Sequence, residues 1–313
     1  MTLLRICDLR THFSTEDGLV KAVDSVSLGI ADREKLGLIG ETGCGKTVLG
    51  MSVIRLLQPT TKIEGKIIYK GRDILQISER EMQKLRGREI AMILQNPTTS
   101  LNPVLKVGEQ IAEAVHLHQG LGKKESWAKA VEMLGAVKIP DAIQRAEQYP
   151  HELSGGMRER AMIAMGLACD PAFIIADEPT KGLDQKTKAQ IVTLLKETME
   201  DRSMMMITHD LGVAGEVCDR IAVMYAGEIL ELSKTKDIFE NPMHPYTQGF
   251  INSLPSRGLK PIPGMSPSLI DPPSGCRFHP RCSLAKDVCR RMHPELATSH
   301  GNGDHGVRCH LCA

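Results

Sequence analysis

The sequence predicts an α/β fold whose parallel sheet carries a phosphate-binding loop. Apolar runs typical of buried strands alternate with segments that place apolar residues at helical spacing. One run leads directly into the sequence Gly-Glu-Thr-Gly-Cys-Gly-Lys-Thr, residues 40–47. In such a sheet a nucleotide binds at the carboxyl ends of the strands. The predicted strands are Lys35–Ile39, Ile90–Leu94, Phe173–Ala176, Ser203–Ile207 and Ile221–Met224.

The composition narrows the class of protein. A chain of 313 residues is long enough for a large core and for more than one module. Its 39 basic and 38 acidic side chains nearly cancel, which argues against a nucleic acid partner. No apolar stretch approaches the roughly 20 residues of a membrane span, and the start lacks a signal-peptide pattern. We therefore expect a cytosolic protein.

The loop at residues 40–47 predicts nucleoside triphosphate binding. Its glycines let backbone N–H groups surround phosphate oxygens, and a helix predicted over Val48–Leu57 directs its positive end at them. Lys46 reaches the outer phosphates, and the Thr47 hydroxyl is a magnesium ligand. A thiol at a helix N-terminus is expected to have a lowered pKa, here that of Cys44. The predicted nucleotide-binding residues of the loop are Gly40, Glu41, Thr42, Gly43, Cys44, Gly45, Lys46 and Thr47.

Two acids follow the strand Phe173–Ala176. An aspartate delivered beside a phosphate loop completes the shell of a magnesium ion, which assigns Asp177 to the metal. The neighbouring Glu178 is placed to orient and polarise the attacking water. The sequence therefore predicts hydrolysis as well as binding.

A third motif sets the family. Leu153-Ser154-Gly155-Gly156 opens a predicted helix, which makes a further anion-binding helix N-terminus. With the phosphate loop before it and the acidic strand after it, the chain resembles the ATPase subunits of ABC transporters. The resemblance implies that Gln95 contacts magnesium, that His209 contacts the γ-phosphate and aligns water with Glu178, and that Asp184 belongs to the loop between subunits.

The same resemblance implies a dimer. In this family ATP is held between the phosphate loop of one subunit and the signature of another, so Ser154, Gly155 and Gly156 would close over the partner's nucleotide. A single ATPase unit is present, and the partner is either identical or a paralogue. The adenine would stack on an aromatic ring near the N-terminus; Phe13 is the candidate, and packing within a strand is an equal alternative.

Other segments of the chain interrupt the alternation of predicted strands and helices, and they predict further parts of the architecture. Helical stretches over Val107–His118 and Lys123–Val137 indicate a helical subdomain, about residues 97–158, that docks on a transmembrane partner. Antiparallel strands are expected at the N-terminus, and a hairpin at Ala226-Gly227. We place the ATPase domain at residues 1–232 and a C-terminal extension at residues 233–313.

The extension indicates a branch of the family. His244-Pro245-Tyr246-Thr247 and the segment Cys276–Cys282 resemble the C-terminal extension of oligopeptide and dipeptide importer ATPases, a branch that includes nickel importers. Four thiolates in a loop-rich segment suit zinc or an iron–sulfur cluster. The resemblance favours a [4Fe–4S] cluster on Cys276, Cys282, Cys289 and Cys309, with zinc as the alternative. The nearby histidines, His279, His293, His300, His305 and His310, are expected at the surface, and Cys7, Cys169 and Cys218 are expected to be buried and inert.

The function predicted is the ATP-hydrolysing subunit of an importer for peptides or a related small solute, peripheral on the cytoplasmic side of the membrane. ATP and Mg²⁺ are the expected cofactors. The expected partners are a second ATPase subunit, two transmembrane permease subunits and, indirectly, an external solute-binding protein. The rival is a soluble ABC ATPase with a role in iron–sulfur assembly or sensing. The sequence does not select among dipeptide, oligopeptide, nickel chelate and other solutes.

Overall fold

The computed structural model describes residues 1–298 and 305–312. The chain divides into two compact units. Unit 1 joins Met1–Gln76 to the C-terminal part that begins at Met206, and unit 2 spans Ile77–Met205. The polypeptide passes from unit 2 to unit 1 within strand β8, Ser203–Thr208.

Unit 1 begins with an antiparallel sheet, as the sequence predicted. β1 (Thr2–Thr15) pairs with β2 (Gly18–Ala31) on one side and with β4 (Lys62–Tyr69) on the other, and β5 (Arg72–Asp73) completes the order β2-β1-β4-β5. Apolar side chains of both β1 and β2 are buried, and their pairing is interrupted by register shifts, for example between Ile6 and Leu9. This sheet supplies the edge that meets the phosphate-binding loop.

The second sheet of unit 1 contains both parallel and antiparallel pairs. β3 (Lys35–Ile39) runs parallel to β9 (Arg220–Tyr225), and β9 turns back through Ala226-Gly227 into β10 (Glu228–Lys234). The short strands β12 (Gly306–Val307) and β11 (Ala297–Thr298) extend it from β10. Helix α9 (Leu211–Val217) precedes β9. The predicted hairpin is therefore present. The last described segment of the chain returns to pair with β10 of this hairpin.

Helix α1 (Lys46–Val53) follows the phosphate loop and is shorter than predicted. The predicted helix reached Leu57, but Arg55 adopts a left-handed φ of 52°. The Leu56 N–H donates to the Met51 carbonyl and the Arg55 N–H to the Ser52 carbonyl, at 2.9 and 3.1 Å. These two bonds form a Schellman motif, which satisfies the last carbonyls and ends the helix. Apolar spacing alone did not reveal this stop.

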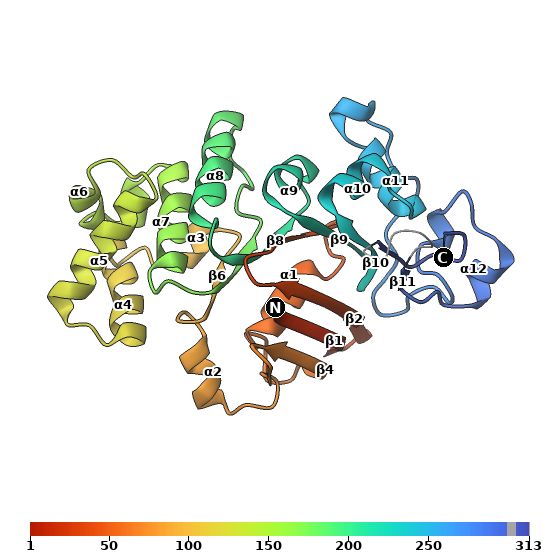
Figure 1. Ribbon diagram of the computed structural model, residues 1–313, viewed down its shortest axis with the longest axis horizontal. Coiled ribbons are helices and arrows are strands. Elements are labelled where there is room, and N and C mark those ends of the chain that lie inside the picture. The colour runs from red at the N-terminus through yellow and green to blue at the C-terminus, as the bar shows by residue number, and fades with distance from the viewer. Residues whose placement is uncertain (299–304, 313) are drawn as a thin grey trace. The chain divides into compact units, whose positions relative to one another are not determined.

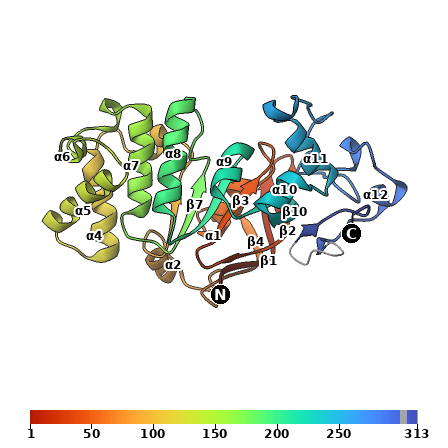
Figure 2. The ribbon, with the colours of Figure 1, turned by 45° about the horizontal axis from the view of Figure 1, so that its top comes forward.

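The C-terminal segment of unit 1, described over residues 233–298 and 305–312, packs on the β9–β10 hairpin through aromatic rings. Tyr225 of β9 lies 4.7 Å from Tyr246 and 5.4 Å from Phe278, measured between ring centroids. Figures 1 and 2 both show α10 and α11 beside β9 and β10. The elements of this segment before β11 are α10 (Thr235–Glu240), α11 (Pro245–Asn252), the 3-10 turns η2 (Pro255–Arg257) and η3 (His279–Arg281), and α12 (Asp287–Arg291).

Unit 2 combines two parallel strands with a group of helices. β6 (Ile90–Ile93) and β7 (Phe173–Asp177) pair in parallel, so their carboxyl ends meet at one edge. Between them the chain forms the predicted helical subdomain, whose α4 and α5 pack against α7. The helices are α2 (Glu79–Leu85), α3 (Pro97–Ser100), α4 (Val107–Gln119), α5 (Lys123–Ala136), α6 (Ala142–Ala146), η1 (Pro150–Glu152), α7 (Gly155–Leu167) and α8 (Gln185–Thr198).

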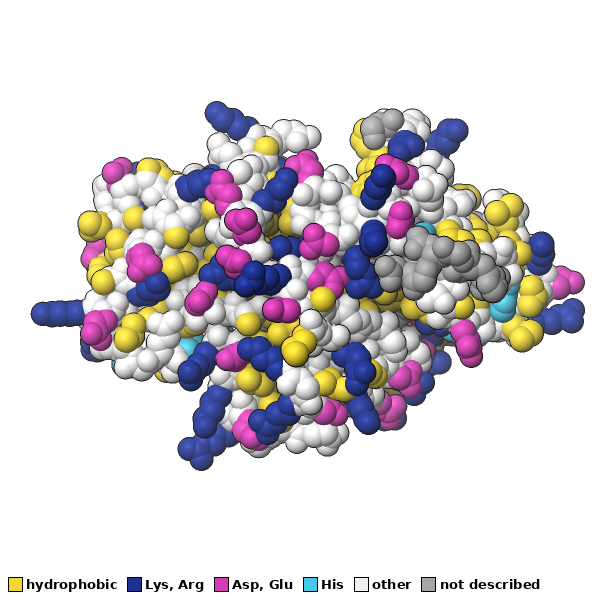
Figure 3. Space-filling view, in the orientation of Figure 1, with side chains coloured by type: hydrophobic (Ala, Val, Ile, Leu, Met, Phe, Trp, Pro, Cys, Tyr) yellow, Lys and Arg dark blue, Asp and Glu magenta, His cyan; other side chains and the backbone are white. Residues whose placement is uncertain are grey.

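The predicted α/β class is confirmed, and each predicted strand lies within one or two residues of its expected bounds. Across residues 1–298 and 305–312, none of the helices combines the length and the apolar character that a membrane span needs. Figure 3 shows acidic and basic side chains interspersed on the visible face, in keeping with their nearly equal numbers.

Candidate functional site

The phosphate-binding loop lies between the end of β3 and the start of α1. Gly40 and Gly45 have φ values of 154° and 108°. A Cβ on Gly40 would lie 2.1 Å from the Met224 carbonyl oxygen, and one on Gly45 would lie 2.0 Å from the Ala22 carbonyl oxygen. Only glycine fits at such distances. Because Gly45 is also the N-cap of α1, no capping side chain competes with a phosphate for the first helical amides.

Lys46 is held inside this loop. Its side chain is buried, and Nζ donates to the carbonyl oxygens of Gly40 and Glu41 at 2.8 and 2.9 Å. The ammonium therefore sits among the amides that a phosphate would contact, where its charge complements phosphate oxygens. Thr47 is half-buried in the first turn of α1, and Thr42 and Gly43 are exposed.

The expected activation of Cys44 is wrong. The thiol is 5% exposed, and burial raises its pKa above the ordinary value although the Lys46 ammonium acts in the opposite direction. Its sulfur packs under the loop instead of facing solvent at the helix N-terminus. Desolvation penalises the thiolate, so the helix dipole does not produce a reactive cysteine here.

The N-terminal hairpin lies against the phosphate loop. The Ala22 carbonyl of β2 touches Gly45, and the Thr11 hydroxyl of β1 hydrogen-bonds the Ser52 hydroxyl of α1 at 2.8 Å. Phe13 follows Thr11 by two residues, is half-buried and pairs with Val20 of β2. These contacts place the hairpin that carries Phe13 beside the loop and its helix. Adenine stacking on Phe13 stays a prediction.

In unit 2 the parallel pairing brings three predicted site residues to one edge. Ile93 of β6 is opposite Ala176 of β7, so Gln95 shortly after β6, Asp177 at the end of β7 and Glu178 after it all lie at the carboxyl ends of the pair. The Asp177 and Glu178 side chains are buried, at 2% and 8% exposure. Glu178 also has a left-handed φ of 49°, a conformation that a non-glycine residue adopts at a cost of about 1–2 kcal/mol. The edge holds two carboxylates and one amide, all oxygen donors suited to Mg²⁺.

His209 belongs to unit 1 and follows the last residue of β8. Its side chain is exposed, and the next residue, Asp210, caps α9 by accepting a hydrogen bond from the Val213 N–H at 3.1 Å. The cap and the buried strand before it fix the backbone on both sides of His209.

Four further predicted residues line one surface groove of unit 2, with a volume of about 860 Å³. Ser154 is the N-cap of α7, where its hydroxyl accepts from the Met157 N–H at 3.3 Å. Asp184 caps α8 by accepting from the N–H groups of Lys186 and Thr187, both at 3.0 Å. A Cβ on Gly156 would lie 2.7 Å from the Thr187 methyl carbon, so a larger residue would separate the two helix starts. Gly155 faces open space in the same groove.

Comparison with known proteins decides the family. Residues 23–181 match the family model described as ABC transporter, and residues 230–289 match that of the oligopeptide/dipeptide transporter C-terminal region. The chain belongs to the ABC transporter ATPases. It also carries the C-terminal region of the oligopeptide/dipeptide branch.

Relatives of this ABC ATPase match over nearly their full length. A probable peptide ABC transporter ATP-binding protein of Sinorhizobium fredii is 48% identical, covering 94% of this chain and 91% of the relative. The oligopeptide transport ATP-binding protein OppD of Salmonella typhimurium is 46% identical, covering 96% and 91%. Among solved structures, a dimeric ATP-binding cassette, MJ0796, with ADP and phosphate is 27% identical with a TM-score of 0.67 and covers 74% of this chain and 98% of its own.

Four cysteines near the C-terminus lie near one another, three of them within the matched region 230–289. Cys276, Cys289 and Cys309 are buried, Cys282 is half-buried, and the Cys276 N–H donates to the Cys289 carbonyl at 2.8 Å. Burial raises the pKa of the Cys276 thiol to about 11, and the nearness of the other three adds to the rise. All nine cysteines are free thiols. Within the described residues, no three His, Cys, Asp or Glu side chains are arranged as ligands of one metal ion.

The other cysteines only partly follow expectation. Cys169 and Cys218 are buried as predicted, and burial raises the pKa of both, that of Cys218 to about 12. Cys7 is only half-buried, so the prediction is wrong for it. Cys312 lies near Cys309 and donates to the Met243 carbonyl at 3.3 Å.

The histidines of this ABC ATPase include a buried one that the sequence placed at the surface. His305 is 3% exposed, and its Nε2 lies 2.7 Å from Glu231 Oε1. His293 contacts Glu228 at 2.8 Å, and ring nitrogens of His279 and His310 meet backbone carbonyls. His300 lies outside the described residues. Sequence reasoning missed Glu231, which lies within the strand β10 and gave no separate signal.

Sequence reasoning also missed two arginines at the phosphate loop, Arg277 and Arg281. Both lie inside the segment Cys276–Cys282, where a charged residue beside each cysteine was the available signal.

Proposed function

We propose that the chain is the ATP-hydrolysing subunit of an importer for di- or oligopeptides or a related small solute. The observation that carries this proposal is the presence, in one chain, of an ABC ATPase and the oligopeptide/dipeptide C-terminal region. Relatives named for dipeptide and oligopeptide transport, 44–46% identical over most of the chain, support it. The rival soluble role would leave peptide uptake unchanged.

The proposed chemistry is hydrolysis of the γ-phosphate by a positioned water. Backbone amides of residues 42–46 and the Lys46 ammonium bind the phosphates, and Phe13 stacks on adenine. Mg²⁺, held by the oxygens of Thr47, Asp177 and Gln95, would neutralise charge on the transferring phosphoryl group. Glu178 polarises the attacking water, and His209 contacts the γ-phosphate and helps hold that water. Positioning and charge supply most of the rate in such reactions.

The groove of unit 2 supports a dimer in which two chains complete each site. Ser154, Gly155 and Gly156 present a helix N-terminus, which suits an anionic phosphate of a partner subunit. Asp184 at the same groove would join the two subunits. In this arrangement residues 1–232 form the ATPase domain with a helical subdomain at about 97–158, and residues 233–313 form the extension. Two transmembrane subunits would receive the helical subdomain on the cytoplasmic side of the membrane, and an external solute-binding protein would act through them.

Peptide uptake by cells tests the transport proposal. Deleting the gene should reduce uptake of labelled dipeptides and oligopeptides to background. The wild-type chain should restore uptake, and Glu178→Gln should not. Unchanged uptake of every peptide length would overturn the peptide assignment while leaving the ATPase intact.

We also propose that Cys276, Cys282, Cys289 and Cys309 hold a [4Fe–4S] cluster. The nearness of the four thiols in a segment with few regular elements supports it, because a bound cluster would add folding energy to such a segment. The described side chains are not arranged as ligands of one ion, so binding would have to draw the thiols together. The cluster would act by joining distant parts of the segment. Zinc on the same thiolates is the alternative outcome of the test.

Metal analysis after anaerobic purification tests this second proposal. Iron and sulfide in about equal amounts, with broad visible absorption, are expected. Cys289→Ser should lose both, and Cys169→Ser, a buried cysteine of unit 2, should keep them. Stoichiometric zinc without iron would replace the cluster by a zinc site. Protein free of both metals would reject the proposal.

A further inference from the structure

The segment Cys276–Cys282 contacts the phosphate-binding loop at Glu41. The Arg281 guanidinium donates from its two terminal nitrogens to the two carboxylate oxygens of Glu41, at 2.9 and 3.1 Å. The Ser266 hydroxyl also donates to this carboxylate, and the Glu41 N–H donates to the Tyr246 hydroxyl at 3.1 Å. Glu41 is therefore held by side chain and backbone, and every one of these partners comes from the C-terminal segment.

Arg281 is itself fixed. Its side chain is 6% exposed, its Nε donates to the Pro263 carbonyl at 2.8 Å, and it lies over the Tyr225 ring at 5.7 Å. Burial of Glu41 opposes ionisation, but the hydrogen bonds from Arg281 and Ser266 outweigh it, and the pKa of Glu41 lies below its ordinary value. Two hydrogen bonds from a buried guanidinium to one carboxylate fix the relative orientation of the two side chains as well as attracting them.

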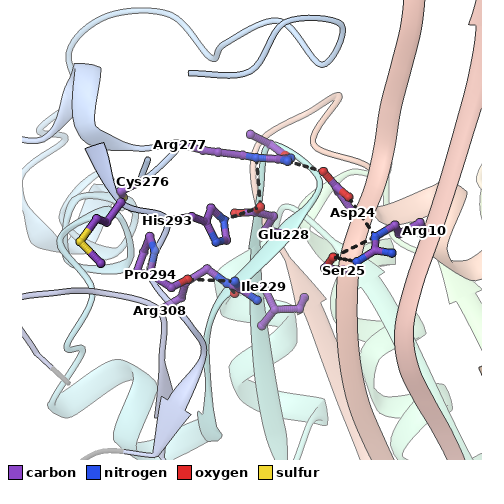
Figure 4. Close-up of polar contacts among 12 residues, drawn as sticks. Arg10, Asp24, Ser25, Glu228, Ile229, Cys276, Arg277, His293, Pro294 and Arg308 are labelled. Atoms are coloured by element: carbon purple, nitrogen blue, oxygen red, sulfur yellow. Dashed lines mark hydrogen bonds and ion pairs between the residues drawn. The ribbon is translucent and has the colours of Figure 1, made fainter. Parts of the chain in front are cut away.

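A second arginine of the same segment reaches the loop through the β9–β10 turn. Arg277, with a side chain 7% exposed, donates to Asp24, to Glu228 at 3.0 Å and to the Ala226 carbonyl. Figure 4 shows Arg277 between the Asp24 and Glu228 carboxylates. The next residue of the turn, Gly227, donates its N–H to the Cys44 carbonyl at 2.9 Å. Arg277 thus supports the loop at Cys44, through the β9–β10 turn, whereas Arg281 contacts it at Glu41.

These contacts affect the position of Lys46, the residue expected to bind phosphate. Lys46 Nζ donates to the carbonyls of Gly40 and Glu41, so the position of Glu41 determines where the ammonium can lie. We propose that Arg281 is a positioning residue that holds Glu41, and with it Lys46, in the arrangement that binds ATP. The C-terminal segment then sets the nucleotide affinity of the ATPase. This inference rests on nucleotide binding at the phosphate loop and on neither the peptide substrate nor a metal.

Nucleotide affinity of the full-length chain tests the proposal. Calorimetry should show that Arg281→Met raises the Kd for MgATP about tenfold, the change expected on losing a charge-assisted hydrogen bond. Arg281→Lys keeps the charge but loses the two-nitrogen contact with the carboxylate, and its Kd for MgATP should lie between those of wild type and Arg281→Met. Arg257→Met, an exposed arginine of the same segment, should bind like wild type.

A double-variant cycle separates positioning from general stability. Glu41→Gln keeps the side-chain shape and should raise the Kd by a similar factor, and the double variant should be no worse than either single one. Amide hydrogen exchange should accelerate at residues 41–46 in Arg281→Met and stay unchanged at the turn 70–71. If Arg281→Met does not fold, Glu41→Gln decides the question. Wild-type affinity in a folded Arg281→Met or Glu41→Gln, or additive effects in the double variant, would overturn the proposal.

Discussion

His305 and Glu231 form a buried pair although 74 residues separate them. Glu231 is fully buried, and it also accepts the N–H groups of Met243 and His244 at 2.7 and 2.9 Å. Burial raises the pKa of Glu231, but these hydrogen bonds outweigh burial and leave it below the ordinary value. One carboxylate thereby connects β10, the start of α11 and the chain beside β12.

Removing His305 should destabilise unit 1. His305→Ala leaves a buried carboxylate short of one donor, and we expect the free energy of unfolding to fall by roughly 2–4 kcal/mol at pH 7. Adding Glu231→Gln should recover part of the loss, because the charge is then gone. Since the pKa of Glu231 is lower in the folded chain, its contribution is complete above its unfolded value and is lost as pH falls through its folded one. Denaturant melts between pH 3 and 7 measure both effects; equal melts for all variants would contradict this role.

Gly45 should not tolerate a side chain. In Gly45→Ala the new Cβ would combine a left-handed φ with the close approach of the Ala22 carbonyl, and we expect a loss of more than about 2 kcal/mol. Gly71→Ala is the matched control, because Gly71 has a φ of 81° and open space around its missing Cβ. It should cost about 1 kcal/mol, from strain alone. Equal melting temperatures for the two variants would show that the close approach has no cost.

Glu159 should make unit 2 less stable as pH rises. Its side chain in α7 is 3% exposed, and burial raises its pKa to about 8, with Arg158 acting in the opposite direction. The folded state therefore keeps a proton that the unfolded state releases near pH 4.5. Stability should decline between about pH 4.5 and 8 and then level off. Glu159→Gln should remove this decline, whereas the exposed Glu113→Gln should retain it; parallel melting curves of wild type and Glu159→Gln against pH would refute the assignment.

Glu178→Gln should bind ATP and hydrolyse it poorly. The amide keeps the shape of the side chain at the end of β7 but cannot polarise water as a carboxylate does, so the turnover number should fall roughly 10²-fold or more. Phosphate release at saturating MgATP, together with the Kd for ATP, separates the two effects. Glu113→Gln should match wild type. Near-normal turnover in Glu178→Gln would remove Glu178 from its proposed role.

The sequence by itself determined the phosphate-binding loop, the strand before it and the two acids at the end of β7. These features are local: glycine at Gly40 and Gly45 permits a backbone that other residues cannot adopt, and short apolar runs between turn residues mark strands. The predicted helix after the loop was too long because a left-handed residue, Arg55, ended it. Apolar periodicity carries no information about such a cap.

Only the tertiary structure decided the burial of Cys44 and His305 and the pairing of Arg281 with Glu41, 240 residues away. A thiol at a helix N-terminus has a lowered pKa only where solvent reaches it, and in the folded chain Cys44 is buried. Likewise the sequence shows the sign of each charged side chain but not the residue with which it pairs. Burial and pairing depend on which distant segments pack together, and that is a property of the fold rather than of any local pattern.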